Sequence, residues 1–379
     1  MKYYIIAGEA SGDLHGSNLI REMKKLAPAI SVRCWGGDKM QAAGGELVKH
    51  YRELAFMGFT EVLMNLRTIF RNLAFCKENI TQYQPDALIL IDYPGFNLRI
   101  AKWAKQQGLK VIYYISPQVW AWKEGRVRMM KECIDKMIVI LPFEKDYFKN
   151  KWNWEVEYVG HPLVDVVASQ QQVGSGESLV GSGEQGFSEK PIVALLPGSR
   201  KQEILKKLPV MLETSRSFPG YQFIVAKAPG LDESFYDELL RPFENVSYVS
   251  GQTYELLMQA EAAIVTSGTA TLETALFGVP EVVCYKGSPI SYQIAKRVIK
   301  VKYISLVNLI MDRLVVKELI QDALTPENLK TELDELLHNQ QRRAQLKNDY
   351  AELKSKLSQQ GSASARAASS IVRFISGAN

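Results

Sequence analysis

Residues 262–273 read Ala-Ala-Ile-Val-Thr-Ser-Gly-Thr-Ala-Thr-Leu-Glu. An apolar run that ends in small hydroxylated residues and opens directly into a helical pattern predicts a strand followed at once by a helix. The start of such a helix offers unpaired N–H groups and a partial positive charge, so Ser267, Gly268 and Thr269 would cradle a phosphate. Glu273 lies one helical turn after Thr269, where its carboxylate could accept hydrogen bonds from a ribose. An ordinary N-cap formed by Ser or Thr is the alternative.

The same strand-then-helix pattern repeats along all 379 residues. Short apolar segments predict ten strands, at residues 3–7, 31–35, 87–91, 111–115, 137–140, 192–196, 222–226, 246–249, 262–265 and 281–284. Amphipathic segments lie between most of them, which is typical of βαβ units and parallel sheets. We therefore expect an α/β fold with two doubly wound, Rossmann-like domains facing a ligand cleft.

A segment rich in Gly, Ser and Gln, residues 169–190, divides the chain near its middle. Few of its residues are apolar, so we expect a flexible linker between an N-terminal domain at 1–168 and a second domain at 191–345. The pattern is helical from residue 325 onward, which predicts C-terminal helices at 346–379. Those helices could pack on their own chain or exchange with a partner in a homodimer.

Composition narrows the class of protein. The net charge of +5, from 46 basic and 41 acidic residues, is too small to indicate nucleic acid, but suits anionic substrates or an anionic membrane surface. The four cysteines, Cys34, Cys76, Cys133 and Cys284, are far apart in the sequence, which suits a reducing cytosol. Neither they nor the four scattered histidines form a metal-binding motif. The chain starts with a predicted strand rather than a signal peptide, and no apolar run could span a bilayer. We expect a cytoplasmic protein.

Polar residues follow the first predicted strand, in the segment 8–13 (GEASGD). Its small residues would let a ligand approach the backbone, with Glu9, Ser11 and Asp13 at the mouth of the site. The spacing is not GxGxxG, so a dinucleotide is not indicated. In the alternative interpretation, Ser11 or Asp13 only caps the following helix.

Asp92 follows the strand at 87–91, and Asn97 is expected to cap the next helix. Asp92 then has no obvious local role, so it is a candidate general base, although aspartate also starts turns. The segment 116–122 (SPQVWAW) places two tryptophans beside basic residues, which suits sugar and phosphate contacts; core packing is the alternative. His161, before a proline, is assigned no chemistry.

In the second half, the strand at 192–196 is followed by Pro-Gly-Ser-Arg at 197–200 and by Glu203. Arg200 would lie beside a helix start, in place to neutralise a phosphate. The alternative is a helix capped by Ser199, with Arg200 on the surface.

An apolar and basic segment spans residues 62–77. Its helical pattern normally indicates a core-facing helix, but Leu63, Met64 and Phe75 make it apolar beyond one face. Together with Arg67 and Arg71 it could lie in a membrane interface. The basic residues Lys296, Arg297, Lys300 and Lys302 could add attraction for anionic lipid.

Seven of these segments occur in an order that resembles the lipid-A-disaccharide synthase family, a family of bacterial inverting glycosyltransferases with a GT-B-like fold. They are residues 8–13 (GEASGD), 91–97 (IDYPGFN), 116–122 (SPQVWAW), 141–145 (LPFEK), 160–162 (GHP), 196–200 (LPGSR) and 267–273 (SGTATLE). The resemblance covers about residues 1–320, apart from the linker, which is longer than expected for the family.

The resemblance implies transfer of 2,3-diacylglucosamine from UDP-2,3-diacylglucosamine to 2,3-diacylglucosamine 1-phosphate. The products would be a β-1,6-linked lipid A disaccharide and UDP. It also implies a peripheral enzyme on the cytoplasmic face of the inner membrane, with no metal and no cofactor. Acylated substrates would explain an apolar helix at residues 62–77.

Residue roles follow from the same resemblance. Asp92 becomes the candidate base for the acceptor's 6-hydroxyl, with Glu9 and Ser11 on the acceptor side. Arg200 and the helix start would stabilise the leaving diphosphate and Glu273 would hold the ribose, although Arg200 and Glu273 could exchange these roles. The candidate substrate- and UDP-binding residues are Ser199, Arg200, Ser267, Gly268, Thr269, Glu273, Asn308 and Gln118.

Two other functions remain open at this point. A UDP-sugar 2-epimerase uses a similar two-domain fold but needs no acyl pocket or membrane-seeking helix. A UDP-sugar-sensing module would bind without turnover and would leave Asp92 without a role.

Overall fold

The computed structural model describes residues 1–54, 66–173, 190–228, 230–288, 292–293, 297 and 301–377. Contacts divide the chain into two compact units. Unit 1 comprises Met1–Pro162 together with Leu357–Asn379, and unit 2 comprises Leu163–Lys356. This division differs from the predicted one, in which residues 346–379 stand apart as C-terminal helices.

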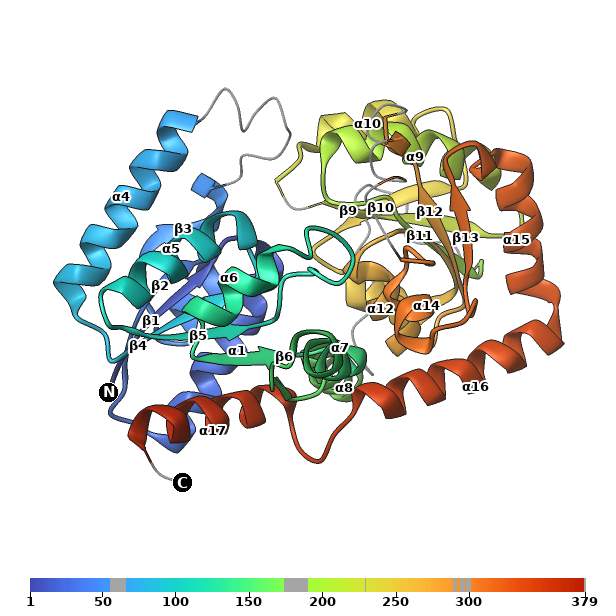
Figure 1. The fold of residues 1–379 in the computed structure, drawn as a ribbon. Coiled ribbons are helices and arrows are strands. Elements are labelled where there is room, and N and C mark those ends of the chain that lie inside the picture. Colours follow the sequence, from blue (N-terminus) through green and yellow to red (C-terminus); the bar gives the residue numbers. More distant parts are fainter. Residues whose placement is uncertain are drawn as a thin grey trace. The chain divides into compact units, whose positions relative to one another are not determined.

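Unit 1 is built on a parallel sheet whose described strands have the order β3-β2-β1-β4-β5-β6-β7 (Figure 1). The strands are β1 Lys2–Ala7, β2 Ser31–Gly36, β3 Glu46–His50, β4 Ala87–Ile91, β5 Lys110–Tyr114, β6 Lys136–Val139 and β7 Glu157–Tyr158. Strand β1 pairs with β2 on one side and β4 on the other, so the strand order reverses between β1 and β4. In open parallel sheets, ligands bind outside the carboxyl ends of the strands at such a reversal.

Helices lie on both faces of this sheet. They are α1 Ala10–Leu26, α2 Asp38–Ala42, α4 Leu66–Tyr83, α5 Pro94–Gln106, α6 Arg126–Cys133, α7 Pro142–Trp152 and the C-terminal α17 Ala363–Ser376, with a 3₁₀ turn at Tyr51–Leu54. The chain's last helix, α17, packs against α1 (Figure 1). In this structure the C-terminal helix therefore contacts its own chain.

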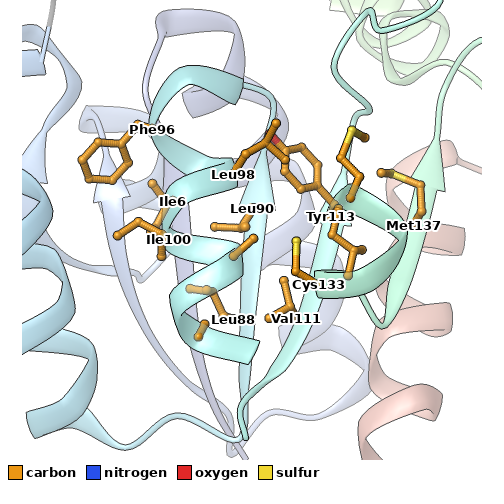
Figure 2. Close-up of a cluster of buried hydrophobic side chains, with 14 of the residues drawn as sticks. Ile6, Leu88, Leu90, Phe96, Leu98, Ile100, Val111, Tyr113, Cys133 and Met137 are labelled. Atoms are coloured by element: carbon orange, nitrogen blue, oxygen red, sulfur yellow. The ribbon is translucent and has the colours of Figure 1, made fainter. Parts of the chain in front are cut away.

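The core of unit 1 explains why these segments become strands and helices. Figure 2 shows Leu90 of β4 and Tyr113 of β5 pointing toward residues of α5 such as Leu98. Both strand residues are fully buried, and Leu98 nearly so. Burial of one such apolar side chain stabilises the fold by about 1.5–3 kcal/mol, so an uninterrupted apolar strand is favoured at the centre of the sheet.

Unit 2 repeats the arrangement with a parallel sheet of described strands in the order β10-β9-β8-β11-β12-β13. The strands are β8 Ile192–Leu196, β9 Gln222–Lys227, β10 Val246–Ser250, β11 Ala260–Thr266, β12 Glu281–Tyr285 and β13 Lys317–Ile320. The helices are α8 Pro162–Val173, α9 Lys201–Ser215, α10 Glu233–Leu240, α11 Thr253–Gln259, α12 Thr269–Leu276, α14 Leu306–Met311, α15 Pro326–His338 and α16 Gln340–Leu357, with a 3₁₀ turn at Gln321–Ala323. Here the order reverses between β8 and β11.

The predicted α/β fold is confirmed, and all ten predicted strands are present with ends that differ by at most two residues. The prediction missed β3, β7 and β13, each of which lies at an edge of its sheet. Edge strands are short and carry charged residues, as in Lys317–Ile320 (KELI), so they lack the apolar run that marks a central strand.

Two predicted boundaries change. Residues 169–173 belong to α8 rather than to the predicted linker, and residues 174–189 lie outside the described residues. The predicted apolar helix at 62–77 corresponds to α4 from Leu66 onward, and residues 55–65, with Leu63 and Met64, lie outside the described residues.

The packing of α17 on unit 1 is testable. Ile371 is fully buried on this helix, so Ile371→Ala should leave a cavity and lower the free energy of unfolding by about 2–4 kcal/mol. Urea unfolding of the full chain would measure this, with Leu26→Ala, a change at a 53% exposed leucine, as the control. Equal stability of the two variants would show that α17 is not docked as described.

Candidate active site

The loops after β1 and β4 meet in unit 1, where the strand order reverses. A Cβ atom on Gly8 would lie 2.3 Å from the ring of Tyr93, so only glycine leaves room for this ring. Asp92 and Tyr93 both adopt left-handed backbone conformations, with φ of +44° and +50°. Such conformations cost energy in non-glycine residues and are found preferentially at functional sites.

Hydrogen bonds to its carbonyl oxygen fix the backbone of Asp92. The Asn97 side-chain amide donates to that oxygen at 2.8 Å, and the Tyr113 hydroxyl donates to it at 2.5 Å. The same amide donates to the Ile91 carbonyl at 3.2 Å. Asn97 is therefore not the N-cap that the sequence suggested: Tyr93 is the N-cap of α5, and Pro94 begins the helix.

The pKa of the Asp92 side chain lies near neutral pH. Burial raises its pKa to about 7, and the nearby charge of Glu9 adds to the increase, while the Tyr93 backbone N–H partly opposes it. A carboxyl group with a pKa near the working pH can accept a proton in one step and release it in the next. The predicted candidate base thus lies in surroundings suited to that role.

A third carboxyl group, Glu144, lies close to Asp92 and was not predicted as a site residue. It is buried at the start of α7, where it accepts hydrogen bonds from the Leu141 N–H at 3.0 Å and the Trp120 indole N–H at 3.1 Å. Burial raises its pKa to about 7, and the charge of Asp92 contributes to the increase. The Leu-Pro-x-Glu pattern of a helix start with a capping box was the available sequence signal.

The segment after β1 divides its polar residues between two tasks. Glu9 is the N-cap of α1, and Ser11 is exposed in the first turn, so neither Ser11 nor Asp13 caps this helix as the alternative proposed. Asp13 is buried and accepts hydrogen bonds from the backbone N–H of Gly37 at 2.7 Å and of Met40 at 3.0 Å. Asp13 therefore anchors the start of α2, and Glu9 and Ser11 are the polar residues of this segment that remain candidate site residues.

The tryptophan-containing segment after β5 does not simply fill the core. Trp120 is half-buried, and Trp122 is 46% exposed, with the Lys123 ammonium 4.1 Å from the centre of its ring. Gln118 is exposed on the same segment. The alternative that both tryptophans are core residues is wrong for Trp122.

In unit 2, the loops after β8 and β11 also meet. Gly198 has a φ of +110°, and a Cβ atom on it would lie 3.6 Å from the methyl group of Thr266, the last residue of β11. Arg200 is the N-cap of α9 and half exposed, and its guanidinium lies 3.3 Å from the carboxylate of Glu203. Ser199 is exposed and precedes the cap, so the serine-capped alternative is wrong.

The start of α12 has the expected open geometry. Gly268 is its N-cap, no side chain caps the helix, and Gly268 and Thr269 are exposed. Ser267 instead donates to the Ile304 carbonyl at 2.9 Å. The carboxylate of Glu273 accepts a hydrogen bond from the Tyr254 hydroxyl at 2.9 Å, which fixes its position on the helix.

Asn308 was predicted to lie near the donor substrate, and the structure gives its side chain hydrogen bonds within unit 2. It is fully buried, its amide donates to Glu318 at 2.8 Å, and its oxygen accepts from the Val315 N–H at 2.7 Å. Glu318 in turn accepts from the Ile304 N–H, next to the carbonyl that binds Ser267. Asn308 therefore supports the loop beside α12 from inside the protein.

Other candidate groups are placed as follows. His161 is buried in unit 1, and burial, with a contribution from His15, lowers its pKa to about 3, so it is neutral at physiological pH.

In the described part of the chain, no cluster of three or more His, Cys, Asp or Glu side chains could hold a metal ion. None of the helices in the described ranges is both long and apolar enough to cross a membrane.

Comparisons with known proteins match nearly the whole chain. A family model described as lipid-A-disaccharide synthetase matches residues 3–372. The lipid-A-disaccharide synthase of Syntrophus aciditrophicus (strain SB) is 41% identical over 365 residues, covering 95% of this chain and 94% of that protein. The lipid-A-disaccharide synthase of Geobacter metallireducens is 42% identical over 351 residues, covering 90% of each chain.

Solved structures with a similar fold are more distant in sequence. UDP-GlcNAc 2-epimerase from Neisseria meningitidis, bound to UDP-GlcNAc, has a TM-score of 0.67 at 12% identity and covers 100% of both chains. The calicheamicin glycosyltransferase CalG4 has a TM-score of 0.59 at 16% identity and covers 100% of this chain and 98% of its own. At these identities the likeness establishes the fold and no more.

The electrostatic coupling in unit 1 gives a direct test. Carboxyl carbon NMR of the full chain should show Asp92 titrating near pH 7, and Glu9→Gln should lower that midpoint because a neighbouring negative charge is lost. Glu22→Gln, on the same helix, is the matched control and should leave the midpoint unchanged. A midpoint near pH 4 in the unmodified protein would contradict the described surroundings of Asp92.

Proposed function

The chain belongs to the lipid-A-disaccharide synthetase family, and on that premise we propose that it transfers 2,3-diacylglucosamine from UDP-2,3-diacylglucosamine to 2,3-diacylglucosamine 1-phosphate. Family membership makes it a glycosyltransferase of lipid A synthesis. The proposed products are the β-1,6-linked disaccharide and UDP. The assignment of catalytic residues rests on one observation: the Asp92 carboxyl group has a pKa of about 7 and lies where the strand order of the sheet reverses.

In the proposed reaction, Asp92 removes the proton of the acceptor's 6-hydroxyl group. The freed oxygen forms a bond to the anomeric carbon from the face opposite UDP, and the bond from that carbon to the diphosphate oxygen breaks. The anomeric configuration inverts, the proton stays on Asp92 until it leaves to solvent, and UDP departs with the bond's electron pair. General-base catalysis of this kind contributes about 10²–10⁴-fold to a rate.

The other residues of unit 1 are proposed to support this base. Glu9 is close enough to affect the ionisation of Asp92, and with Ser11 and Gln118 it is assigned to the acceptor sugar. Glu144 accepts a hydrogen bond from the Trp120 indole N–H, and the charge of Asp92 contributes to the raised pKa of Glu144. The negative charge of Glu9 favours the protonated form of Asp92 and adds to the effect of burial, so the pKa of Asp92 is raised to about 7.

The proposed role of unit 2 is to bind UDP and stabilise its charge as it leaves. The N–H groups at the start of α12 and the guanidinium of Arg200 supply positive charge for the diphosphate, with Ser199 and Ser267 nearby. The closeness of Gly198 to Thr266 supports their joint use, since Thr266 is the last residue of β11 and the chain runs from it into the start of α12. We propose that these groups act without a metal ion, and that Glu273 binds the ribose.

A membrane role is proposed for α4. Arg67, Phe70, Arg71 and Phe75 are exposed, and because Phe70, Arg71 and Phe75 follow Arg67 by three, four and eight residues, they lie toward one side of the helix and form one apolar and basic face. Phe70 is 64% exposed, which is unusual for so large an apolar side chain. An exposed face of this composition suits binding to the cytoplasmic surface of the inner membrane, where the acylated substrates would reside.

The exposed basic residues Arg297 and Lys302 are proposed to strengthen the attraction of the protein to anionic lipid. Lys296 and Lys300, which the sequence placed in the same basic group, lie outside the described residues.

The assignment of Asp92 is tested by Asp92→Asn. Turnover should fall by about 10²–10⁴-fold because the amide cannot accept the proton, while UDP affinity should stay within about twofold of the unmodified protein. Asp146→Asn, at an exposed carboxylate on α7, is the matched control. Normal turnover in Asp92→Asn would remove this residue from the mechanism.

The membrane assignment is tested by Phe70→Ser. Binding to phosphatidylglycerol-containing vesicles should weaken several-fold, whereas the melting temperature should change little because the side chain is largely exposed. Leu314→Ser, at a 59% exposed leucine in unit 2, controls for loss of any exposed apolar side chain. A lower melting temperature with unchanged vesicle binding would make α4 an ordinary core helix.

A further inference from the structure

A polar pocket lies in unit 1, formed by α17 and the first residues of β6 and β7. Its volume is about 480 Å³, and its lining includes Lys136, Glu157, Arg366, Ser369, Arg373 and Phe374. Three of these side chains are cations and one is an anion. Neither the candidate catalytic residues nor the proposed UDP-binding residues contribute to the lining.

The pocket lies toward the opposite end of the sheet from the candidate active site. Lys136 is the first residue of β6 and Glu157 the first of β7, so both mark amino ends of strands. Asp92 and Glu144 instead follow the carboxyl ends of β4 and β6. The amino ends and the carboxyl ends of parallel strands lie on opposite sides of the sheet, so a ligand of this pocket would not compete directly with the acceptor.

The single carboxylate of the pocket, Glu157, already has an ion-pair partner and a hydrogen-bond donor. Glu157 pairs with the Lys136 ammonium at 2.8 Å and accepts a hydrogen bond from the Ser370 hydroxyl. Burial alone would raise its pKa, but these hydrogen bonds and the charges of Lys136 and Arg366 outweigh burial, so its pKa is lowered. Glu157 therefore stays ionised, and its single negative charge offsets one of the three cations, which leaves the pocket with a net positive charge.

Arg366 also keeps unused hydrogen-bonding capacity. Its Nη1 is 3.5 Å from the side-chain oxygen of Gln359 and 3.5 Å from the Gln360 carbonyl. Its Nε and Nη2 are buried and have no acceptor among the residues that the structure describes. Buried N–H donors are normally satisfied, so two unsatisfied donors on one guanidinium call for an acceptor that the chain itself does not supply.

The surroundings of Phe374 add further positive charge. The Lys110 ammonium lies 5.6 Å from the centre of its ring, and the Lys136 ammonium lies 5.5 Å from it. Cations over a ring are held by its electron-rich face, so both ammonium groups stay near the pocket. Arg373 is exposed and has no carboxylate within ion-pair distance in the described part of the chain.

We propose that this α17 pocket binds a phosphate group. The pocket offers the guanidinium groups of Arg366 and Arg373 and the Ser369 hydroxyl, and a phosphate group presents three terminal oxygens and up to two negative charges to them. The phosphate could belong to a free small molecule or to an anionic lipid headgroup. Both present the same chemistry to the pocket.

The test uses ¹⁵N-labelled full-length protein and follows the backbone amide signals of Ser369, Ser370 and Arg373 by NMR. Inorganic phosphate should shift these signals saturably, and Arg366→Gln with Arg373→Gln should weaken the binding at least tenfold because two of the pocket's three cations are lost. The control, Arg21→Gln with Lys25→Gln, removes the same charge from exposed positions on α1 and should bind as the unmodified protein does.

A second arm distinguishes the source of the phosphate. Vesicles of phosphatidylglycerol and phosphatidylcholine at 3:7 replace inorganic phosphate, with pure phosphatidylcholine for comparison. The pocket would be assigned to lipid headgroups, and the phosphate chemistry upheld, if the anionic vesicles perturb the same amide signals, pure phosphatidylcholine vesicles do not, and the double variant shows no such perturbation. Should the double variant fail to fold, Arg373→Gln alone, at an exposed position, should still weaken binding several-fold.

Two results would overturn the proposal. One is that neither inorganic phosphate nor anionic vesicles perturb the α17 amides of the unmodified protein. The other is that the pocket variants and the α1 control bind equally, which would make any binding a general effect of surface charge.

Discussion

The hydrogen bonds of the Asn97 amide are the interaction on which the site in unit 1 depends. This single group donates to the Ile91 and Asp92 carbonyls and approaches the Ile6 carbonyl at 3.4 Å, so it joins the carboxyl ends of the two central strands. It thereby holds Asp92 in a left-handed conformation that the residue would not favour alone. The packing of Tyr93 on Gly8, the proximity of Glu9 and the raised pKa of Asp92 all require that loop geometry.

The two units use one architecture for different chemistry. Each has a parallel sheet whose order reverses at its first strand, and each places a glycine where two loops meet. Around that point unit 1 gathers Glu9, Asp92 and Glu144, whereas unit 2 offers Arg200 and an uncapped helix start. UDP-GlcNAc 2-epimerases share the fold, so the fold alone does not choose a reaction, and the family match does.

Sequence patterns predicted the central strands and the segments that follow them, because buried strands are apolar and ligand-binding loops use small polar residues. They missed the charged edge strands, and they mistook Asn97 for a helix cap because its amide reaches backward to strand ends rather than to its own helix. The full burial of Asn308 was not predicted, because burial cannot be read from a short motif. The proximity of Glu144 to Asp92 joins residues 52 positions apart, which no local pattern encodes.

The central claim is that a sugar is transferred to a sugar-phosphate acceptor. The most direct measurement is UDP release by the purified protein in detergent micelles, from UDP-2,3-diacylglucosamine in the presence of EDTA, with and without 2,3-diacylglucosamine 1-phosphate. If the protein is the proposed transferase, release will require the acceptor, survive chelation and yield a product with the mass of the disaccharide. Release without the acceptor, or UDP binding with no turnover at all, would contradict this claim.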